Sequence, residues 1–446
     1  MANPEYTFNA IVIGGGPGGT SAAKTLASAG KKVVLVSTEL GGECLNYGCI
    51  PTKIYLWTCE LLEKITMAAG QGIEVSVARA DWQKIKEYRT KIVEKLKKSL
   101  KYTLELSGVK IIEGFGKLKD AHTVGVESAQ GQQELKAQYI ILAAGSESIS
   151  PQGITPDGIR ILNSHQILEL KEAPKTLLII GGGVISVEFA SIFSALGAQV
   201  TIAEVSDRIL RGSDPDVSAE IERVFIRKGI KVLKNTKVTA EQTQNFEKTL
   251  IAAGRRPILK HLGLENAGVK TNQRAIETND FMQTNLENIF AIGDAAGKAM
   301  LAYTADREGR IAAQKILGKN PEFINYKAIP YTIFSLPETS SVGLTEPEAQ
   351  NMKTPYIAAK SLMSANSKAL ITGNRDGFAK ILAEKSSHKI LGVHIVGEKA
   401  SELIAEASLA LSLGLTLEQF NKNLHSHPVL SESLAEACEK ALEMVK

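Results

Sequence analysis

The chain has 446 residues, too many for one hydrophobic core, so we expect about three domains. A formal net charge of +4 is too small to favour a nucleic-acid partner, and no apolar run approaches the roughly 20 residues that cross a bilayer. The first nine residues carry no signal-peptide core, and four cysteines fit a reducing compartment. We therefore expect a cytoplasmic enzyme without a membrane or nucleic-acid partner.

The first recognisable unit is a nucleotide-binding turn. Residues 8–13 form an apolar stretch typical of a buried strand, and residues 20–29 are typical of a helix. The glycine-rich segment between them has the spacing G-x-G-x-x-G. In this context Gly14 permits the tight turn, Gly16 lets a pyrophosphate approach the backbone, and Gly19 lets helix and strand pack closely. The helix amino terminus then faces the phosphates.

The pattern recurs after residue 175. A strand is predicted for residues 176–180, followed by Gly181 and Gly183, with Ser186 at the third glycine position. The acidic residue Glu204 follows the next strand, where a carboxylate accepts both ribose hydroxyls of an adenosine and repels a 2′-phosphate. This second site should therefore prefer NAD(H) to NADP(H). Two such units imply two nucleotide cofactors, or one cofactor and one nucleotide substrate.

The two units differ in detail. The first has Ser37 at the position of the acidic residue, so either Glu39 substitutes or the ribose is held more weakly. The first unit closes with three predicted strands within residues 109–145, whereas the corresponding stretch of the second, residues 230–254, is shorter and has no segment for a middle strand. We expect a trimmed β-meander in the second unit.

A cysteine pair lies between the two turns. Cys44 and Cys49 are separated by four residues, glycines flank them, and Lys53 follows. In a chain without secretory features, two close thiols indicate redox chemistry or metal binding rather than a structural bridge. Two helices, residues 54–69 and 81–106, follow as an insertion into the first unit; the second helix is amphipathic with a solvated basic face.

The last third of the chain has a different pattern of predicted strands and helices. A strand delivers Asp294 to a loop at its carboxyl end, where open α/β sheets bind ligands. From residue 326 the pattern of strands and helices predicts an α+β module. Near its end, His427 and Glu432 could form a general base with an orienting carboxylate. His425 and His427 together also suggest metal, but no further ligand cluster accompanies them.

Residues 41–53, 289–294 and 427–432 together closely resemble the flavin-dependent pyridine nucleotide–disulfide oxidoreductases, over essentially the whole chain and in the same order. The resemblance implies an α/β fold with two Rossmann-like FAD/NAD(P)-binding domains and an α+β dimerisation domain. The final His-Pro-x-Leu-Ser-Glu stretch and Glu204 are most similar to the family members that oxidise dihydrolipoamide. The implied domains are FAD-binding (1–150 and 257–325), NAD-binding (151–256) and interface (326–446).

The resemblance also implies two cofactors, FAD and NAD, and no metal. The implied FAD-binding residues are Gly14, Gly16, Gly19, Gly42, Lys53, Gly116, Gly145, Ser146, Asp294 and Ala302. The implied NAD-binding residues are Gly181, Gly183, Glu204 and Gly254.

The implied reaction runs from dihydrolipoamide through a Cys44–Cys49 disulfide and FAD to NAD+. In the family's arrangement Cys44 exchanges with substrate, Cys49 lies against the flavin, and Lys53 lies near flavin N5 and pairs with Glu188. His427, oriented by Glu432, is the base and comes from the neighbouring subunit of a homodimer.

The implied partner is a lipoyl-bearing subunit of a 2-oxoacid dehydrogenase or glycine cleavage complex. One alternative is a related reductase of another low-molecular-weight disulfide, such as a glutathione-type substrate, or of another acceptor. The other is a non-catalytic flavoprotein subunit, which the intact cysteines, lysine and histidine oppose.

Overall fold

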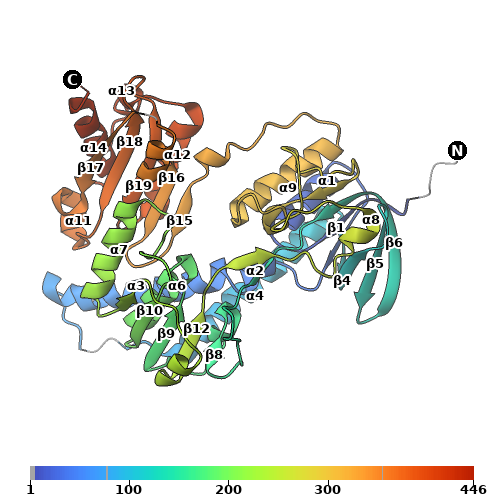
Figure 1. Cartoon of the computed structure of the whole chain (residues 1–446), viewed down its shortest axis with the longest axis horizontal. Coiled ribbons are helices and arrows are strands. Elements are labelled where there is room, and N and C mark those ends of the chain that lie inside the picture. Colours follow the sequence, from blue (N-terminus) through green and yellow to red (C-terminus); the bar gives the residue numbers. More distant parts are fainter. Residues whose placement is uncertain (1–5, 77–78, 354, 446) are drawn as a thin grey trace. The chain divides into compact units, whose positions relative to one another are not determined.

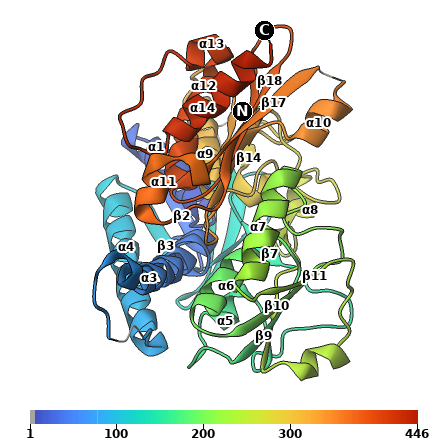
Figure 2. The same ribbon diagram turned by 90° about the vertical axis from the view of Figure 1, so that its left-hand side faces the viewer.

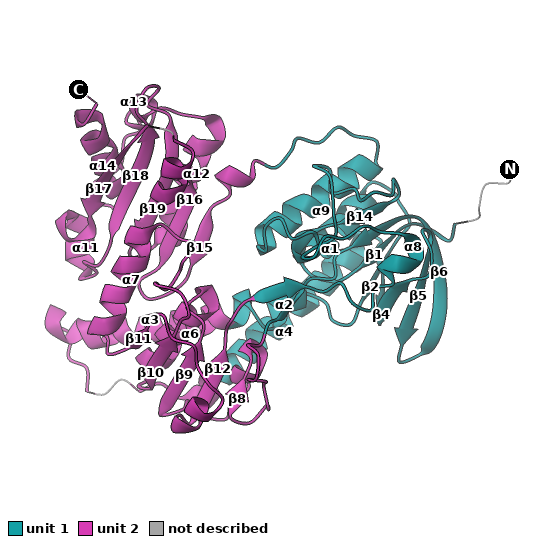
Figure 3. Cartoon of the chain, in the orientation of Figure 1, with its two compact units in different colours: residues 1–51, 86–149, 255–324 teal, residues 52–85, 150–254, 325–446 magenta. Residues whose placement is uncertain are grey.

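The structure is a computed structural model that describes residues 6–76, 79–353 and 355–445 (Figure 1). These residues fall into two compact units (Figure 3). Unit 1 contains Met1–Pro51, Lys86–Ile149 and Arg255–Ile324, and unit 2 contains Thr52–Ile85, Ser150–Gly254 and Asn325–Lys446. No described helix combines the length and apolar character needed to span a bilayer. The predicted α/β fold class is confirmed.

Unit 1 is built on one mixed sheet with the strand order β3-β2-β1-β6-β5-β4 and β14 beside β6. Its strands are β1 (Phe8–Ile13), β2 (Val33–Ser37), β3 (Lys110–Glu113), β4 (Phe115–Leu118), β5 (Thr123–Ser128), β6 (Gly131–Leu142) and β14 (Ile289–Ala291). Strands β3, β2, β1, β6 and β14 run parallel, whereas β6, β5 and β4 form an antiparallel meander. Residues 10–13 of the central strand β1 are all apolar and buried because both faces of the strand are covered.

Two helices of unit 1 pack closely because glycines line their contact. Helix α1 (Pro17–Ser28) follows β1, and α9 (Ala302–Ile316) follows β14. A Cβ atom at Gly309 would lie 2.3 Å from the carbonyl oxygen of Gly18, so only glycine lets the two backbones come this near. This contact fixes α1, whose amino terminus forms the nucleotide turn, against α9, the helix that follows the segment with Asp294.

Unit 2 contains a second nucleotide-type sheet, with five parallel strands in the order β11-β10-β9-β12-β8. The strands are β8 (Ile161–Leu162), β9 (Thr176–Ile180), β10 (Gln199–Ala203), β11 (Lys231–Leu233) and β12 (Lys248–Ile251), with helices α6 (Val184–Ala195) and α7 (Pro215–Arg227) packed on them (Figure 2). Among the described residues, β11 and β12 are linked through one 3-10 turn, η2 (Glu241–Asn245), and not through antiparallel strands. The predicted trimmed meander is confirmed.

Helix α3 (Cys49–Ala68) and the start of α4 (Trp82–Leu106) pack on this second sheet through aromatic side chains. Trp82 stacks on Tyr55 with ring centroids 4.8 Å apart and on Phe193 of α6 at 5.5 Å. The sequence predicts both helices as an insertion into the first unit. Residues 52–85 group instead with unit 2, whereas α4 from Lys86 onward groups with unit 1. The amphipathic pattern shows that these helices bury one face, but not which sheet that face meets.

The carboxyl-terminal part of unit 2 is an antiparallel sheet with the order β15-β16-β19-β18-β17, which confirms the predicted α+β module. Its elements are β15 (Tyr331–Ile333), β16 (Thr339–Gly343), β17 (Tyr356–Leu362), β18 (Phe378–Glu384), β19 (Ile390–Val396), α12 (Ala400–Leu413), α13 (Leu417–Phe420) and α14 (Glu432–Glu443). Helix α7 lies between this sheet and the parallel one (Figures 1 and 2).

The remaining described elements are short. They are α2 (Gly42–Asn46), η1 (Ala69–Gln71), β7 (Ser146–Ser148), α5 (Ser164–Ile167), β13 (Arg255–Pro257), α8 (Leu264–Ala267), η3 (Gly293–Ala296), η4 (Tyr326–Ala328), α10 (Glu346–Asn351), η5 (Met363–Ala365) and α11 (Ser367–Thr372). Strands β7 and β13 pair antiparallel in unit 1, beside the segment that carries Asp294.

Candidate active site

The first glycine turn has the shape of a phosphate cradle. Gly14 has φ 114°, and a Cβ atom there would lie 2.1 Å from the carbonyl oxygen of Ala143. A Cβ atom at Gly19 would lie 1.9 Å from the carbonyl oxygen of Gly14, whereas one at Gly16 would meet nothing within 4 Å. The outer two glycines are therefore needed for close packing, and the middle one borders open space at the start of α1. This geometry fits the pyrophosphate of a dinucleotide.

The second turn repeats this geometry in unit 2. Gly181 has φ 108°, with Ala252 at the position that Ala143 takes in the first turn, and Gly183 again faces open space. Glu204 follows β10, and its two carboxylate oxygens accept hydrogen bonds from the backbone N–H of Gly182 at 2.5 Å and of Ser206 at 2.7 Å. Ser186 fits with its side chain fully buried, and its hydroxyl has no hydrogen-bond partner among the described residues.

Ser37 takes the place of Glu204 in the first turn. Its hydroxyl accepts a hydrogen bond from the backbone N–H of Gly15 at 3.0 Å, the same contact that Glu204 makes with Gly182. The carboxylate of Glu39 is bonded elsewhere: it accepts from the Tyr47 hydroxyl at 2.7 Å and from Lys97 Nζ at 2.5 Å. Glu39 thus ties the cysteine segment to α4.

The cysteine segment starts against the first turn. Gly41, with φ 91°, donates its N–H to the carbonyl oxygen of Gly15 at 2.8 Å. A Cβ atom at Gly42 would lie 2.8 Å from Gly16 Cα, so glycine is required where the segment passes the phosphate cradle. Cys44 lies on α2 and Cys49 begins α3; both are half-buried thiols.

Asp294 lies in unit 1, on η3 directly after β14. Its Oδ2 accepts a hydrogen bond from the Ser146 hydroxyl at 2.5 Å. Burial raises the pKa of Asp294 above its ordinary value, while the bond from Ser146 and the charge of Arg255 act in the opposite direction. Glu308, fully buried on α9, holds the same loop by accepting from the Gly293 N–H at 2.6 Å. Sequence reasoning missed Glu308, which looks like an ordinary helix residue.

Arg255 is a second residue that sequence reasoning missed. Its guanidinium donates to Ser146 Oγ at 2.9 Å, to the Ser146 carbonyl oxygen at 2.7 Å and to Glu43 Oε1 at 2.8 Å. Glu43 directly precedes Cys44 on α2. One side chain thus joins the cysteine helix to the residue that holds Asp294. The only signal in the sequence was the position of Arg255 directly after Gly254.

Three other residues predicted for the first nucleotide, Gly116, Gly145 and Ala302, fall in unit 1, whereas Lys53 falls in unit 2. Gly116 lies on β4, where a Cβ atom would touch the Ile13 side chain at 3.3 Å. Gly145 has φ 77° and faces open space, and Gly254 of unit 2 has φ 118°. Ala302 is the first residue of α9, so its backbone N–H is available at a helix amino terminus.

Lys53 and Glu188 come together in unit 2, as predicted from the family resemblance. Lys53 Nζ lies 2.8 Å from both carboxylate oxygens of Glu188, and it lies 4.7 Å from the centre of the Phe334 ring. Glu188 is 4% exposed. Its Oε1 also accepts from the Phe334 backbone N–H at 3.0 Å, so the carboxylate has partners from two directions.

His427 and Glu432 form the predicted pair in unit 2. His427 Nδ1 lies 2.8 Å from Glu432 Oε1, and the Val429 N–H donates to Glu432 Oε2 at 2.9 Å. That backbone bond and the imidazole lower the pKa of Glu432 below its ordinary value. The His427 side chain is 70% exposed, so its Nε2 edge faces outward. His425 bonds to a different carboxylate, Glu406, at 3.1 Å, so the two histidines do not share a ligand site.

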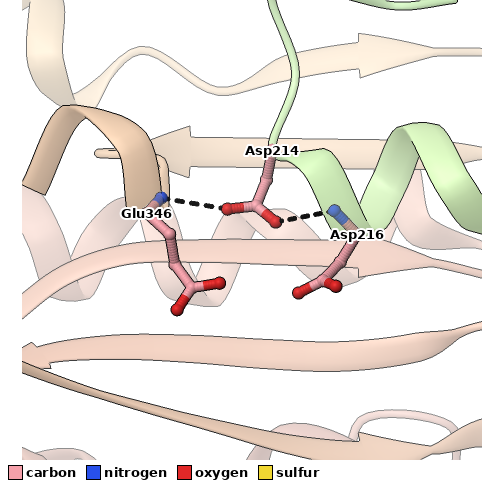
Figure 4. Close-up of side chains that lie close together, drawn as sticks. All are labelled: Asp214, Asp216 and Glu346. Atoms are coloured by element: carbon pink, nitrogen blue, oxygen red, sulfur yellow. Dashed lines mark hydrogen bonds between the residues drawn. The ribbon is translucent and has the colours of Figure 1, made fainter. Parts of the chain in front are cut away.

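A buried charge cluster lies apart from these residues, between α7, α10 and β18. Among the described residues, Asp214, Asp216 and Glu346 are the one carboxylate group compact enough to share a metal ion. The two Asp214 oxygens accept from the backbone N–H groups of Glu346 and Asp216 (Figure 4). However, Lys380 Nζ, fully buried, lies 2.8 Å from Asp214 and 2.5 Å from each of the other two. An ammonium group therefore takes the cation's place.

Two dinucleotide turns on one chain suit an oxidoreductase that passes electrons between two nucleotides. The thiol pair beside the first turn makes a disulfide the natural third participant. The chain belongs to the pyridine nucleotide–disulphide oxidoreductase family: residues 8–309 match that family and residues 329–438 match its dimerisation domain. Members of this family use FAD and NAD(H), and the open glycine cradles of both turns fit two dinucleotides.

Curated relatives and solved structures agree over nearly the full length. A protein named dihydrolipoyl dehydrogenase from Chlamydia muridarum (strain MoPn / Nigg) is 37% identical, with 98% of this chain and 97% of the relative covered. One of the same name from Geobacillus stearothermophilus is also 37% identical, with 97% and 96% covered. The crystal structure of LpdA from Mycobacterium tuberculosis superposes with a TM-score of 0.89 at 26% identity, covering 97% and 99%. The HOCl-induced flavoprotein disulfide reductase RclA from Escherichia coli, as its Cu(II) complex, gives 0.88 at 27%, covering 98% and 100%.

Proposed function

We propose that this chain is a dihydrolipoyl dehydrogenase, which oxidises protein-bound dihydrolipoamide and reduces NAD+ to NADH. The observation that carries the proposal is that one chain supplies residues for both halves of the reaction. A thiol pair begins at the first nucleotide turn, and the second turn ends in a carboxylate suited to an unphosphorylated ribose. The names of the relatives, at 33–37% identity over nearly the whole chain, support the substrate.

FAD, when bound, supplies the electron chemistry between the thiols and the nicotinamide. We assign its pyrophosphate to Gly14, Gly16 and Gly19, and its remaining contacts to the predicted residues Gly42, Lys53, Gly116, Gly145, Ser146, Asp294 and Ala302. Asp294 suits this role because it is buried and is held in place by Ser146. For Lys53 and Glu188 we propose the pairing known from the family, which their 2.8 Å contact supports.

Cys44 and Cys49 carry the exchange step. In the proposed direction Cys44 and Cys49 start as a disulfide, and a dihydrolipoyl thiolate attacks Cys44 Sγ, which forms a mixed disulfide and releases the Cys49 thiolate. The second dihydrolipoyl thiolate then attacks the substrate sulfur of the mixed disulfide, which releases lipoamide and leaves Cys44 and Cys49 reduced. His427 accepts the thiol proton of the substrate, because its Nδ1 is held by Glu432 and its Nε2 edge remains available. Glu432 stays ionised to lower pH than an ordinary carboxylate and stabilises the imidazolium that forms.

The dimerisation domain supports a homodimer, and we propose that His427 serves the active site of the partner subunit. The same domain exposes large apolar side chains that a partner would cover: Leu409 at 61%, Leu413 at 66% and Leu424 at 93%. The lipoyl group would come from a subunit of a 2-oxoacid dehydrogenase or glycine cleavage complex. A cytoplasmic location stays a prediction from the cysteine content.

A mixed-dimer experiment tests the shared site. Cys44→Ser and His427→Gln chains are each inactive alone, but a hybrid dimer of the two contains one site with an intact cysteine and an intact histidine if the histidine crosses over. Activity should return when the two variants are unfolded together and refolded. Continued inactivity of verified hybrid dimers would show that each chain uses its own histidine.

A second candidate is the reduction of a different disulfide, because RclA, a flavoprotein disulfide reductase, is similar over 98% of this chain. Anaerobic titration of the holoenzyme separates the two. With dihydrolipoamide we expect a long-wavelength charge-transfer absorbance followed by NADH formation from added NAD+. Turnover only with glutathione, or only with NADPH, would refute the proposed substrate or the role of Glu204.

A further inference from the structure

We propose that Arg255 and Glu43 are a charge-matched pair that positions the cysteine helix α2 and sets the electrostatic balance of the flavin site. The proposal rests on the proposed function only in that FAD occupies the first nucleotide site. Both residues lie in unit 1.

The position of Arg255 follows from the two-stranded ladder that carries it. Strands β7 and β13 pair antiparallel, with Arg255 opposite Ser148 and Pro257 opposite Ser146. The Ile258 N–H donates to the Gly145 carbonyl oxygen at 3.0 Å and fixes the end of the ladder. The guanidinium is thereby held over Ser146, to which it donates twice.

The hydrogen bonds form a continuous chain from Asp294 to Glu43, the residue that precedes Cys44. The Ser146 hydroxyl donates to Asp294 and accepts from Arg255 Nε, while Arg255 Nη1 donates to Glu43 on α2 at 2.8 Å. The Arg255 side chain is 15% exposed and that of Glu43 is 31% exposed, so the pair is partly removed from solvent. A pair in such a position is stronger and less screened than one on an open surface.

The charges explain why a pair is needed. Two carboxylates, Glu43 and Asp294, lie near one guanidinium, and thiolate formation at Cys44 adds a further negative charge beside Glu43. Negative charge disfavours both a thiolate and a reduced, anionic flavin, whereas positive charge favours them. Arg255 offsets the carboxylate that the sequence places next to the reactive thiol.

Removing either charge should therefore shift the flavin reduction equilibrium, and the two removals should shift it in opposite directions. Arg255→Met should make the bound flavin harder to reduce, changing the equilibrium constant for its reduction on the order of threefold. Glu43→Gln should make it easier to reduce by a similar factor, and the double variant should return near the wild-type value. Arg255 is thus a positioning residue: its hydrogen bonds hold α2, and its charge favours reduction of the flavin.

The measurement is the flavin reduction equilibrium of each holoenzyme against redox dyes, under anaerobic conditions at low and high salt. A matched control is Glu147→Gln on the same ladder, because Glu147 pairs with Arg256 at 2.8 Å but both side chains are about half exposed. This control should leave the equilibrium unchanged. The dye measurement uses no dihydrolipoamide, so it stands even if the substrate assignment fails.

Two outcomes would overturn the proposal. If both single variants shift the equilibrium in the same direction, or neither shifts it, the pair has only a structural role. If Arg255→Met does not retain FAD, Glu43→Gln alone decides the question, because it leaves the Ser146 bonds of Arg255 intact. A Glu43→Gln enzyme whose flavin is unchanged or harder to reduce would then refute the charge argument.

Discussion

Replacing Lys380 by methionine should destabilise unit 2 more than a typical single substitution. The ammonium group is fully buried and bonds to three carboxylates whose oxygens lie within 4.8 Å of one another. Burial alone would lower the pKa of Lys380, but the bonds to Asp214, Asp216 and Glu346 raise it above its ordinary value. Lys380 therefore remains charged in the folded protein.

Its removal leaves three acidic groups close together with their main counter-charge gone. Removing one partner of a buried ion pair costs about 3–5 kcal/mol, which for a unit of this size lowers the unfolding midpoint on the order of 10 °C. Lys360→Met is the matched control: Lys360 pairs with Asp216 at 2.7 Å, but its side chain is 38% exposed. Its loss should cost less than about 1 kcal/mol.

The stabilisation by Lys380 should depend on pH in a defined direction. In the wild type, burial alone would raise the pKa of Asp214, but the Glu346 N–H and Lys380 hold it below its ordinary value. The stabilisation is therefore present above the unfolded pKa of about 3.9 and lost as pH falls through the lower folded pKa. In Lys380→Met, repulsion raises the pKa of at least one carboxyl group above its unfolded value. The stability deficit of the variant should then shrink as pH falls from 7 to about 5.

Tryptophan fluorescence reports this unit selectively, because the two tryptophans of the chain, Trp57 and Trp82, both lie in unit 2. Unfolding of the holoenzyme should be followed at pH 7 and pH 5 for the wild type and both lysine variants. A loss below about 1 kcal/mol in Lys380→Met, or a deficit that grows toward pH 5, would refute the account of a buried counter-ion.

Three further predictions concern the reaction. Glu204→Gln should raise KM for NAD+ about tenfold and reduce the preference of the enzyme for NAD+ over NADP+, because a charged acceptor for the ribose hydroxyls is lost. Steady-state kinetics with both cofactors checks this. His427→Gln should slow dihydrolipoamide oxidation by about 10²- to 10⁴-fold while NADH still reduces the flavin at the wild-type rate, a split that stopped-flow absorbance resolves. Cys49→Ser should abolish the long-wavelength band and Cys44→Ser should retain it; the reverse pattern would exchange the roles of the two thiols.

Much of the fold could be predicted from local patterns because the central strands are buried on both faces. The predicted ranges for β1 (8–13) and β9 (176–180) match the structure, since apolar residues dominate both strands. Residues 109–145 were predicted to hold three strands but hold four, because residues 110–118 divide into β3 and β4 at Gly114. A Cβ atom there would lie 2.6 Å from the Glu127 carbonyl oxygen, a constraint that only the folded sheet imposes.

In the site, too, contiguous motifs could be predicted from the sequence, whereas residues whose partners lie far away in the chain could not. The glycine turns and the cysteine pair are contiguous motifs, so the sequence alone indicates their chemistry. The partners of Arg255 lie 109 and 212 residues away, and Asp214 lies 166 residues from Lys380. No periodicity marks such residues: Lys380 is a single lysine within the otherwise apolar run 378–383 of β18. Its burial is intelligible only once α7 and α10 bring three carboxylates to it.

The two nucleotide turns differ where their expected ligands differ. In each turn a side chain at the end of the second strand accepts a hydrogen bond from a glycine N–H. In the first turn the Ser37 hydroxyl accepts from Gly15, and in the second turn the Glu204 carboxylate accepts from Gly182. A soluble cofactor must be selected from a mixture and released, so a charged group that repels a 2′-phosphate has a direct use at the second turn. A resident cofactor is held by many contacts at once, and the loss of one ribose acceptor costs it little of its total affinity. The first turn can therefore give its nearest carboxylate, Glu39, to Tyr47 and Lys97, where it fixes the segment between the two reactive cysteines.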